Sequence, residues 1–339
     1  MTANLAVAER KGHNELEELE FQLEAYRGEL TGYCYRMLGS AFEAEDAVQE
    51  SLLRAWRSFD QFEGRSSLRS WLYRIATNVC LDMLNGSQRR ARPMDLAAAQ
   101  TADAALREPL PEVTWVEPIP DGRVSPAEGD PAQVAELRES IRLAFVAALQ
   151  HLAPRQRAVL ILRDVLRWKA TEVAELLGTT VASVTSALQR ARATLADGEV
   201  SANAPPQPMD EAQEALLDRY VDAFERYDMD LLTSLLHEDA TWSMPPYDLW
   251  LKTHQDIRKW CMGPGIGCRG SRLIPTRANG SPAFAQYKPG GAAGTYVAWS
   301  LHVLEINNEQ ITGICFFLDT PKVFPLFGHP LRVTDQDLC

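Results

Sequence analysis

A proline-rich acidic segment in the first half of the chain most constrains its architecture. Residues 93–136 contain seven prolines, and residues 96–136 carry eight acidic against two basic side chains. Proline fixes φ and removes a backbone donor, and like charges repel, so this composition is typical of an extended linker. The chain has 339 residues, more than one hydrophobic core usually covers. A second proline-rich linker is predicted at 197–210, which leaves three folded regions.

The first region, residues 15–92, has helical apolar spacing throughout. Ser40 is the predicted N-cap of a helix over 41–59, with Glu43 completing a capping box. The apolar stripe predicted for that helix comprises Ala47, Val48, Leu52, Ala55 and Trp56. After a turn with Gly64, Ser66 or Ser67 is expected to cap a second helix. Its predicted apolar positions are Leu68, Trp71, Leu72, Ile75, Val79 and Met83.

The second region, residues 137–196, has the spacing of a helix-turn-helix motif. Gly178 fits the turn because that position requires a positive φ, and Thr180 can cap the following helix. The inner face of that helix is predicted to contain Val181, Val184, Leu188, Ala191 and Leu195. Its outer face carries hydroxyl, amide and guanidinium groups suited to base edges and phosphates. A plain helical hairpin in a bundle is the alternative interpretation of this spacing alone.

Charge favours the nucleic-acid interpretation of the motif. The whole chain has a net charge of −12, but residues 137–195 hold nine basic and four acidic residues, a net of +5. Residues 65–92 add six arginines against one acidic residue, Asp82. Phosphate backbones respond to the charge within the binding footprint, so local basicity outweighs the negative total. The six cysteines are far apart, and they predict neither a disulfide framework nor a zinc site.

The third region, residues 211–330, predicts an α+β fold. Two helices, over EAQEALLDRYVDAFERYD and MDLLTSLLH, precede strand-like runs separated by turn residues. We expect these runs to form an antiparallel curved sheet. No apolar run is long enough to cross a bilayer, and the N-terminus lacks the pattern of an export signal, so a cytoplasmic location is expected.

Two sequence blocks together resemble the extracytoplasmic-function (ECF) sigma factors of the sigma-70 family. They are EAEDAVQESLLRAWRSFDQFEGRSSLRSWLYRIATNVCLDML and LAPRQRAVLILRDVLRWKATEVAELLGTTVASVTSALQRARATL. The resemblance implies two all-α domains, σ2 and σ4, that bind core RNA polymerase through its β′ clamp and β subunits and read promoter −10 and −35 DNA. It also implies that the acidic linker threads the RNA exit path of the polymerase, where the alternative is a mere tether.

The resemblance assigns site residues in both helical regions. It assigns docking on the polymerase to Asp46, Gln49, Glu50 and Arg54. It assigns recognition and melting of the −10 element to Phe62, Arg65, Ser66, Tyr73, Arg74 and Asn78. Trp71 is either a core residue or a platform on which bases stack. Contacts to the −35 element fall on Arg163, Ser183, Thr185, Ser186, Gln189, Arg190 and Arg192. Many relatives have a cation where this chain has Thr185 and Ala187, which predicts weaker or unusual −35 binding.

The third region resembles the SnoaL-like domains of the NTF2-like superfamily, which form a cone around an apolar pocket. The predicted lining comprises Trp242, Met244, Tyr247, Trp250, Trp260, Tyr296, Trp299, His302, Phe316 and Asp319. Related folds include cyclases and isomerases that use an Asp or His base, for which the candidates are Asp239, His254, His302 and Asp319. No partner acid or base is fixed at a defined spacing, so catalysis is the minor hypothesis.

The leading hypothesis is therefore a sigma factor that is not an enzyme and needs no cofactor or metal. Its C-terminal domain is expected to modulate activity by intramolecular contact with σ2, σ4 or the linker, since residues 196–339 have a net charge of −8. One alternative is a DNA-binding regulator with an effector domain. Another is a bifunctional protein with a cyclase-like or isomerase-like C-terminal domain.

Overall fold

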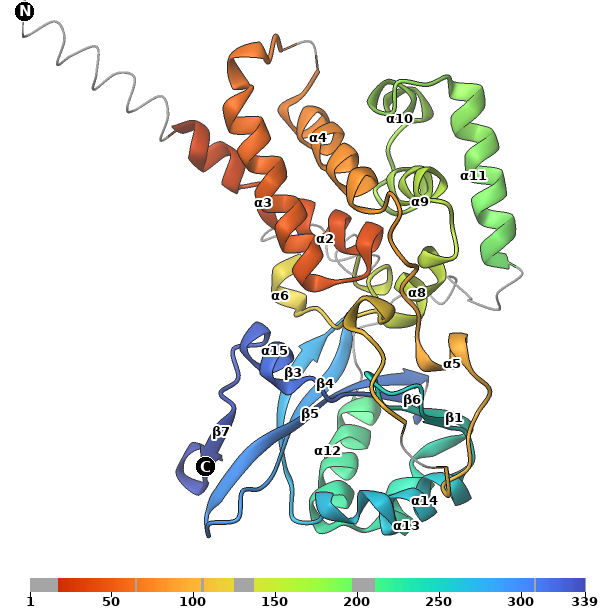
Figure 1. Cartoon of the computed structure of the whole chain (residues 1–339), viewed down its shortest axis with the longest axis vertical. Coiled ribbons are helices and arrows are strands. Elements are labelled where there is room, and N and C mark those ends of the chain that lie inside the picture. Colours follow the sequence, from red (N-terminus) through yellow and green to blue (C-terminus); the bar gives the residue numbers. More distant parts are fainter. Residues whose placement is uncertain are drawn as a thin grey trace, which may run out of the picture. The chain divides into compact units, whose positions relative to one another are not determined.

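A computed structural model describes residues 18–64, 66–104, 107–124, 137–196, 211–307 and 309–338 (Figure 1). The chain divides into two compact units, each described by itself below. The helical unit consists of described residues within 1–88, 122–140 and 148–201. The sheet unit consists of described residues within 89–121, 141–147 and 202–339.

The helical unit contains both regions with helical periodicity. Its main helices are α2 (Arg27–Leu38), α3 (Ala41–Arg57), α4 (Leu68–Met83), α9 (Pro154–Leu160), α10 (Ala170–Leu176) and α11 (Val181–Ala196). Shorter elements are η1 (Phe59–Gln61) and η3 (Ile161–Val165), while α6 (Asp121–Val124) and α8 (Leu143–Gln150) contribute residues to both units. Helix α4 ends at Met83, so the first region is not helical up to residue 92 as the periodicity predicted.

The predicted helix starts and the predicted turn are confirmed. The Ser40 hydroxyl accepts a hydrogen bond from the Glu43 amide at 3.2 Å, and Ser67 caps α4 in the same way. An N-cap of this type contributes about 1 kcal/mol to stability. Gly178 adopts φ +60° between α10 and α11, and the Thr180 hydroxyl accepts from the Ser183 amide at 3.1 Å. These caps fix where the outer face of α11 begins.

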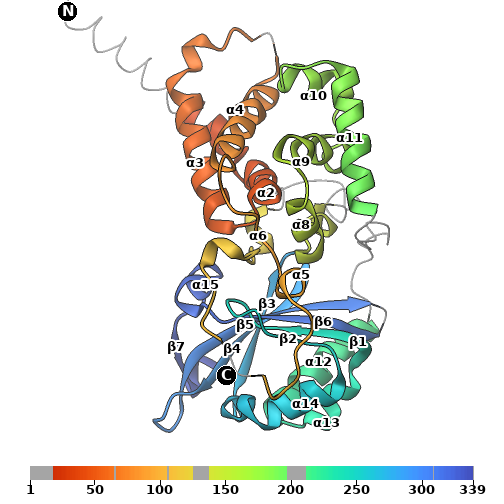
Figure 2. The same ribbon diagram turned by 45° about the vertical axis from the view of Figure 1, so that its right-hand side comes forward.

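The sheet unit is a seven-stranded sheet covered by helices (Figure 2). Its strands are β1 (Leu236–Ser243), β2 (Trp250–Leu251), β3 (Arg272–Ala278), β4 (Ser281–Pro289), β5 (Thr295–Asn307), β6 (Gln310–Phe317) and β7 (Arg332–Thr334). Its helices are α12 (Glu211–Arg226), α13 (Met229–Ser234), α14 (His254–Met262) and α15 (Thr320–Leu326), with short α5 (Pro93–Leu96) and helical turns η2 (Glu112–Thr114), η4 (Pro264–Cys268) and η5 (Asp335–Leu338). Helices α12, α13 and α14 pack a shared apolar core against the sheet.

The sheet is mixed, where the sequence predicted antiparallel pairing. The strand order is β2-β1-β6-β5-β4-β3, with β7 paired to β5. Strand β1 pairs with β6 in parallel, Trp242 opposite Ile314, and every other strand pair in this order is antiparallel. The pairing joins strands about 70 residues apart in sequence, and local patterning carries no signal for such a partner.

The proline-rich segment differs most from expectation. Described residues 91–121 lie within the sheet unit instead of forming a free extended tether. Ala91 forms a parallel bridge with Trp115, and Pro120 forms an antiparallel bridge with Ala278. The Asn279 side chain accepts from the Ile119 amide at 3.0 Å and donates to the Ile141 carbonyl at 2.7 Å. The second predicted linker, 197–210, and residues 125–136 lie outside the described residues.

Candidate protein and nucleic-acid interfaces

The outer face of α3 presents polar and apolar side chains together. Asp46 and Gln49 are exposed, and Glu50 accepts a 2.6 Å hydrogen bond from Arg54 one turn later. Trp56 is 49% exposed and Leu53 is 39% exposed. The helical spacing of Asp46, Gln49, Leu53 and Trp56 places these four side chains on one face of α3. Assignment of Trp56 to the buried stripe is therefore wrong, whereas Ala47, Val48, Leu52 and Ala55 are buried.

An aromatic cluster lies beside the loop between α3 and α4. The rings of Phe62 and Trp71 are 5.0 Å apart, and Phe59 stacks on Phe62 at 5.9 Å. Phe62, Ser66 and Trp71 are all half-buried, so their surfaces remain in part accessible. Arg65, which the resemblance placed in this loop, lies outside the described residues.

Tyr73 is fully buried, which differs from its expected presentation to DNA. Its ring lies 5.1 Å from Tyr33 and 5.0 Å from Trp168, a residue between η3 and α10. The Arg69 guanidinium lies 5.3 Å from the ring centres of both Tyr73 and Trp168. Burial raises the pKa of the Tyr73 hydroxyl well above its ordinary value. Within the helical unit, Trp168 of the second region thus covers Tyr73, the residue that was expected to read the −10 element.

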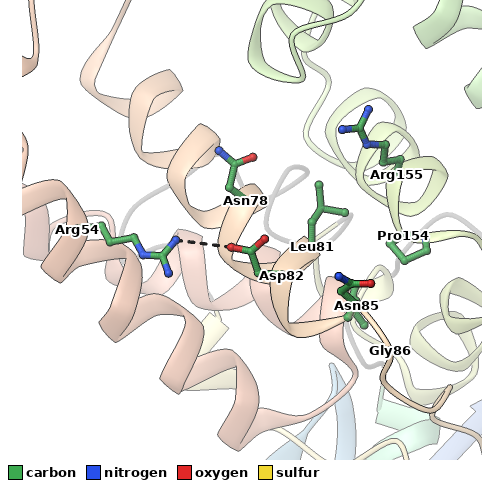
Figure 3. Close-up of a pocket in the computed structure, with 9 residues that line it drawn as sticks. Arg54, Asn78, Leu81, Asp82, Asn85, Gly86, Pro154 and Arg155 are labelled. Carbon is green, nitrogen blue, oxygen red and sulfur yellow. Dashed lines mark ion pairs between the residues drawn. The ribbon is translucent and has the colours of Figure 1, made fainter.

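The remaining −10 candidates on α4 are more accessible than Tyr73. Arg74 is half-buried, and its Nη2 lies 3.7 Å from Oε1 of Glu175 on α10. Asn78 is exposed and lines a cavity of about 650 Å³ between α4 and the start of α9 (Figure 3). Arg54 and Arg155 also line this cavity, and Arg54 Nη1 lies 3.8 Å from Oδ2 of Asp82. Cations and amides around a cavity are suited to a phosphate backbone.

Two buried arginines connect the two helical regions. Arg157 on α9 donates to the Met37 carbonyl of α2 and, at 2.6 Å, to Oε1 of Gln150. Arg36 on α2 donates to the Ser140 hydroxyl at 2.7 Å, and burial lowers its pKa to about 10. Sequence reasoning missed both residues, because a guanidinium that bonds to backbone carbonyls has no local pattern. Removing a partner from such a buried cation is costly, so these contacts fix the packing.

The outer face of α11 is open to solvent. Exposed side chains on it are Ser183, Thr185, Ser186, Gln189, Arg190 and Arg192. Arg192 makes two hydrogen bonds to the Asp164 carboxylate, at 2.7 and 2.8 Å. Arg163 is half-buried and donates to the Trp168 carbonyl. Val181 is 43% exposed and not on the inner face as predicted, whereas Val184, Leu188 and Ala191 are buried.

The predicted lining of the C-terminal pocket is largely packed together. The rings of Trp242 and Phe316 are 4.3 Å apart, and His302 lies 4.5 Å from Phe316. Buried residues of the predicted set are Trp242, Met244, Trp260, His302 and Phe316, while Tyr247, Trp250, Tyr296 and Asp319 are half-buried. Trp299 was assigned to the lining in error, since it is 37% exposed and Lys288 Nζ lies 3.2 Å from its ring centre.

The four candidate acid-base residues have separate surroundings. His302 bonds to the Tyr220 hydroxyl at 2.8 Å and to Oε1 of Gln286 at 3.0 Å, and burial lowers its pKa to about 3. Asp239 is exposed and pairs with Lys252, and His254 Nε2 bonds to the His237 carbonyl. Burial raises the pKa of Asp319. Among the described residues, no hydrogen bond or ion pair joins any two of these four side chains.

Two further properties concern metals and membranes. In the described part of the chain, no group of three or more His, Cys, Asp or Glu side chains is arranged to hold a metal ion. Within the same residues, no helix combines the length and the apolar character that a membrane span requires.

Known families match all three regions. Sigma-70 region 2 matches residues 23–90, sigma-70 region 4 matches residues 142–195, and a SnoaL-like domain matches residues 217–314. The chain is 46% identical over 336 residues to the ECF RNA polymerase sigma factor SigG of Mycobacterium tuberculosis, covering 96% of this chain and 88% of SigG.

The crystal structure of a second mycobacterial relative supports the fold. ECF RNA polymerase sigma factor SigJ of Mycobacterium tuberculosis is 30% identical over 223 residues, which cover 66% of this chain and 63% of SigJ. In a structural comparison, the crystal structure of SigJ matches with a TM-score of 0.58 and 23% identity, covering 91% of this chain and 99% of that one. Because the chain is 46% identical to SigG over 96% of its residues and carries sigma-70 regions 2 and 4 in that order, it belongs to the ECF sigma factors of the sigma-70 family, with a SnoaL-like domain after region 4.

Proposed function

We propose that the outer face of α3 is the surface by which this sigma factor docks on the β′ clamp of core RNA polymerase. Sigma factors bind core polymerase and promoter DNA, and the proposal concerns which residues do so here. Support comes from the exposed Trp56 and Leu53 beside Asp46 and Gln49. An exposed aromatic side chain within a polar rim is typical of a protein-binding hot spot.

Promoter contacts are proposed on two separate surfaces of the helical unit. The −10 surface comprises Phe62, Ser66, Tyr73, Arg74 and Asn78, with the aromatic cluster as a platform for unstacked bases. The −35 surface is the exposed face of α11, where Ser186, Gln189 and Arg190 are free to reach base edges. Arg192 is held by Asp164, so we assign it a supporting role at the edge of that surface.

We further propose that the structure corresponds to a closed state of the free sigma factor. The observation that carries this is the Trp168 ring over Tyr73, reinforced by Arg74–Glu175 and by Arg157 on the Met37 carbonyl. For Tyr73 to meet a flipped base, Trp168 has to move away. The two arrangements then form an equilibrium that core polymerase and promoter DNA shift toward the open state.

The sigma assignment is tested by transcription from a cognate promoter. Core RNA polymerase plus the full-length chain is expected to give a specific run-off transcript, and the chain is expected to co-purify with core. Absence of a transcript from every promoter in a library, together with no association with core, would falsify the proposal. A run-off transcript that persists when α11 carries Ser186→Ala and Arg190→Ala would instead remove only the −35 assignment.

Replacing Trp168 with alanine is expected to open the closed state. The change removes the ring that covers Tyr73 and one partner of the Arg69 cation–π contact, worth about 1–2 kcal/mol in total. At core concentrations below saturation, we expect open promoter complexes to increase about five- to thirty-fold, as measured by permanganate footprinting. Trp299→Ala, which removes an exposed ring in the sheet unit, serves as the control. Unchanged footprints in both variants would show that Trp168 does not limit opening.

A further inference from the structure

The linker between the two helical regions makes a series of backbone contacts with the SnoaL-like domain. We call residues 97–104 and 107–112 the strap. The Trp250 indole donates to the Ala97 carbonyl at 2.8 Å, and the Gln100 amide donates to the Trp250 carbonyl at 2.9 Å. The Leu110 amide donates to the Pro246 carbonyl at 2.9 Å. Backbone bonds of this kind hold an extended peptide with little dependence on its side chains.

One small side chain of the strap enters the core of the domain. Ala102 is 3% exposed and belongs to the same apolar cluster as Trp242, Trp260 and Phe316. The Ala102 amide donates to Oδ1 of Asp256 at 3.1 Å, near the start of α14. Packing density inside a core leaves no room for a larger or charged group at such a position. Ala102 therefore fixes the register of the strap on the domain.

Charged pairs follow on both sides of Ala102. Asp103 pairs with Lys259 of α14, and Glu112 pairs with Lys322 of α15. Arg107 Nη1 lies 3.2 Å from Oδ2 of Asp248. These pairs are largely exposed, so each adds little affinity but favours one register. The acidic residues of the linker thus meet lysines of a domain that is acidic overall.

We propose that the SnoaL-like domain is a peptide receptor and that its occupant is the strap of the same chain. Core RNA polymerase then has to remove the strap from the domain before the linker can run through the polymerase. The withdrawal step rests on the proposed sigma function, in which the linker runs through the polymerase. Because occupant and receptor share one chain, their effective concentration is high and even a weak site stays filled. Polymerase that binds the linker more tightly than the domain does would empty the site. In this way the C-terminal domain opposes holoenzyme assembly without touching DNA.

Hydrogen exchange on the full-length chain tests whether the site is filled. In the free protein, we expect the amides of Gln100, Ala102 and Leu110 to exchange at least tenfold more slowly than the exposed Ala98 and Ala99. Ala102→Asp places a charge in the core contact and should remove this protection, while Ala99→Asp at an exposed position of the strap should keep it. Strap amides that exchange freely in the unmodified protein would overturn the proposal.

A cross-link tests withdrawal without any substitution. A carbodiimide joins the Asp103 carboxylate to the Lys259 amine as an amide, with the water taken up by the carbodiimide, and peptide mass spectrometry detects the product. We expect the yield to fall at least tenfold when core polymerase is bound, and the cross-linked chain to bind core at least tenfold more weakly. Lys259→Gln is the matched control, since it removes the amine that forms the cross-link together with one exposed ion pair that adds little affinity.

The outcomes separate the two proposals. A protected strap and a cross-link that persists on polymerase-bound chain would overturn withdrawal while leaving the sigma function intact. A chain that never binds core would overturn the sigma function, and with it withdrawal, while exchange in the free protein still decides whether the strap fills the domain. Should Ala102→Asp unfold the sheet unit, as shown by loss of protection in β5, the cross-link yields on unmodified protein decide the question.

Discussion

Trp56→Glu is expected to lower the affinity of this sigma factor for core RNA polymerase at least thirtyfold. Trp56 is 49% exposed on the outer face of α3, one turn after Leu53 and two turns after Gln49. Truncating a tryptophan at the centre of an interface typically costs about 2 kcal/mol or more, which corresponds to roughly thirtyfold in Kd. Glutamate adds an unpaired charge to the buried contact, so the loss should reach or exceed this value.

The control for Trp56→Glu is an exposed aromatic residue outside the docking face. Phe21 is 75% exposed near the beginning of the described chain, and Phe21→Glu is expected to leave core affinity within about twofold. Titration of labelled core polymerase gives both dissociation constants, and thermal unfolding should coincide for the two variants and the unmodified protein. If Trp56→Glu binds core as well as Phe21→Glu does, docking takes place on another surface.

The helical elements were the most predictable part of the fold. Caps and turn residues act on their immediate neighbours, so Ser40, Thr180 and Gly178 could be placed from the sequence alone. Apolar spacing also identified most of the buried residues of α3 and α11, but on α4 only Leu72 and Val79 of the six predicted positions are buried. It failed for Trp56 and Val181, two large apolar residues that the structure exposes. Periodicity alone cannot distinguish an apolar residue in a core from one at a binding surface.

Features that depend on distant segments could not be predicted. The parallel pairing of β1 with β6 and the burial of Tyr73 beneath Trp168 both join residues far apart in sequence. The prediction of a free extended linker was wrong for a related reason, since prolines and acidic residues are typical of unfolded chain. Its backbone groups nevertheless bond to Trp250 and Pro246, and Ala102 is small enough to enter the core. Composition describes what a segment does alone, whereas these contacts depend on the surface that receives it.

The second large effect concerns His302 and the pH dependence of the sheet unit. Its ring is fully buried among Tyr220, Phe224 and Phe316, and both ring nitrogens bond to neutral groups. Burial without an acidic partner disfavours the imidazolium, which lowers the pKa from 6.5 to about 3. In the unfolded chain the same residue takes up a proton near pH 6.5. Below that pH the unfolded state binds more protons, so the free energy of unfolding falls as the pH falls.

This single residue should therefore remove about 2 kcal/mol from the stability of the sheet unit between pH 7 and pH 5. The full contribution is present above pH 6.5, and the loss continues until the pH approaches 3. His302→Gln keeps a donor and an acceptor but cannot titrate, so its stability should be lower at pH 7 by about 1–3 kcal/mol and depend less on pH. Urea titrations at both pH values, followed by tryptophan fluorescence, measure the difference. Equal losses in the unmodified protein and in His302→Gln would mean that His302 already carries its proton in the folded domain, or that it opens to water before the domain unfolds.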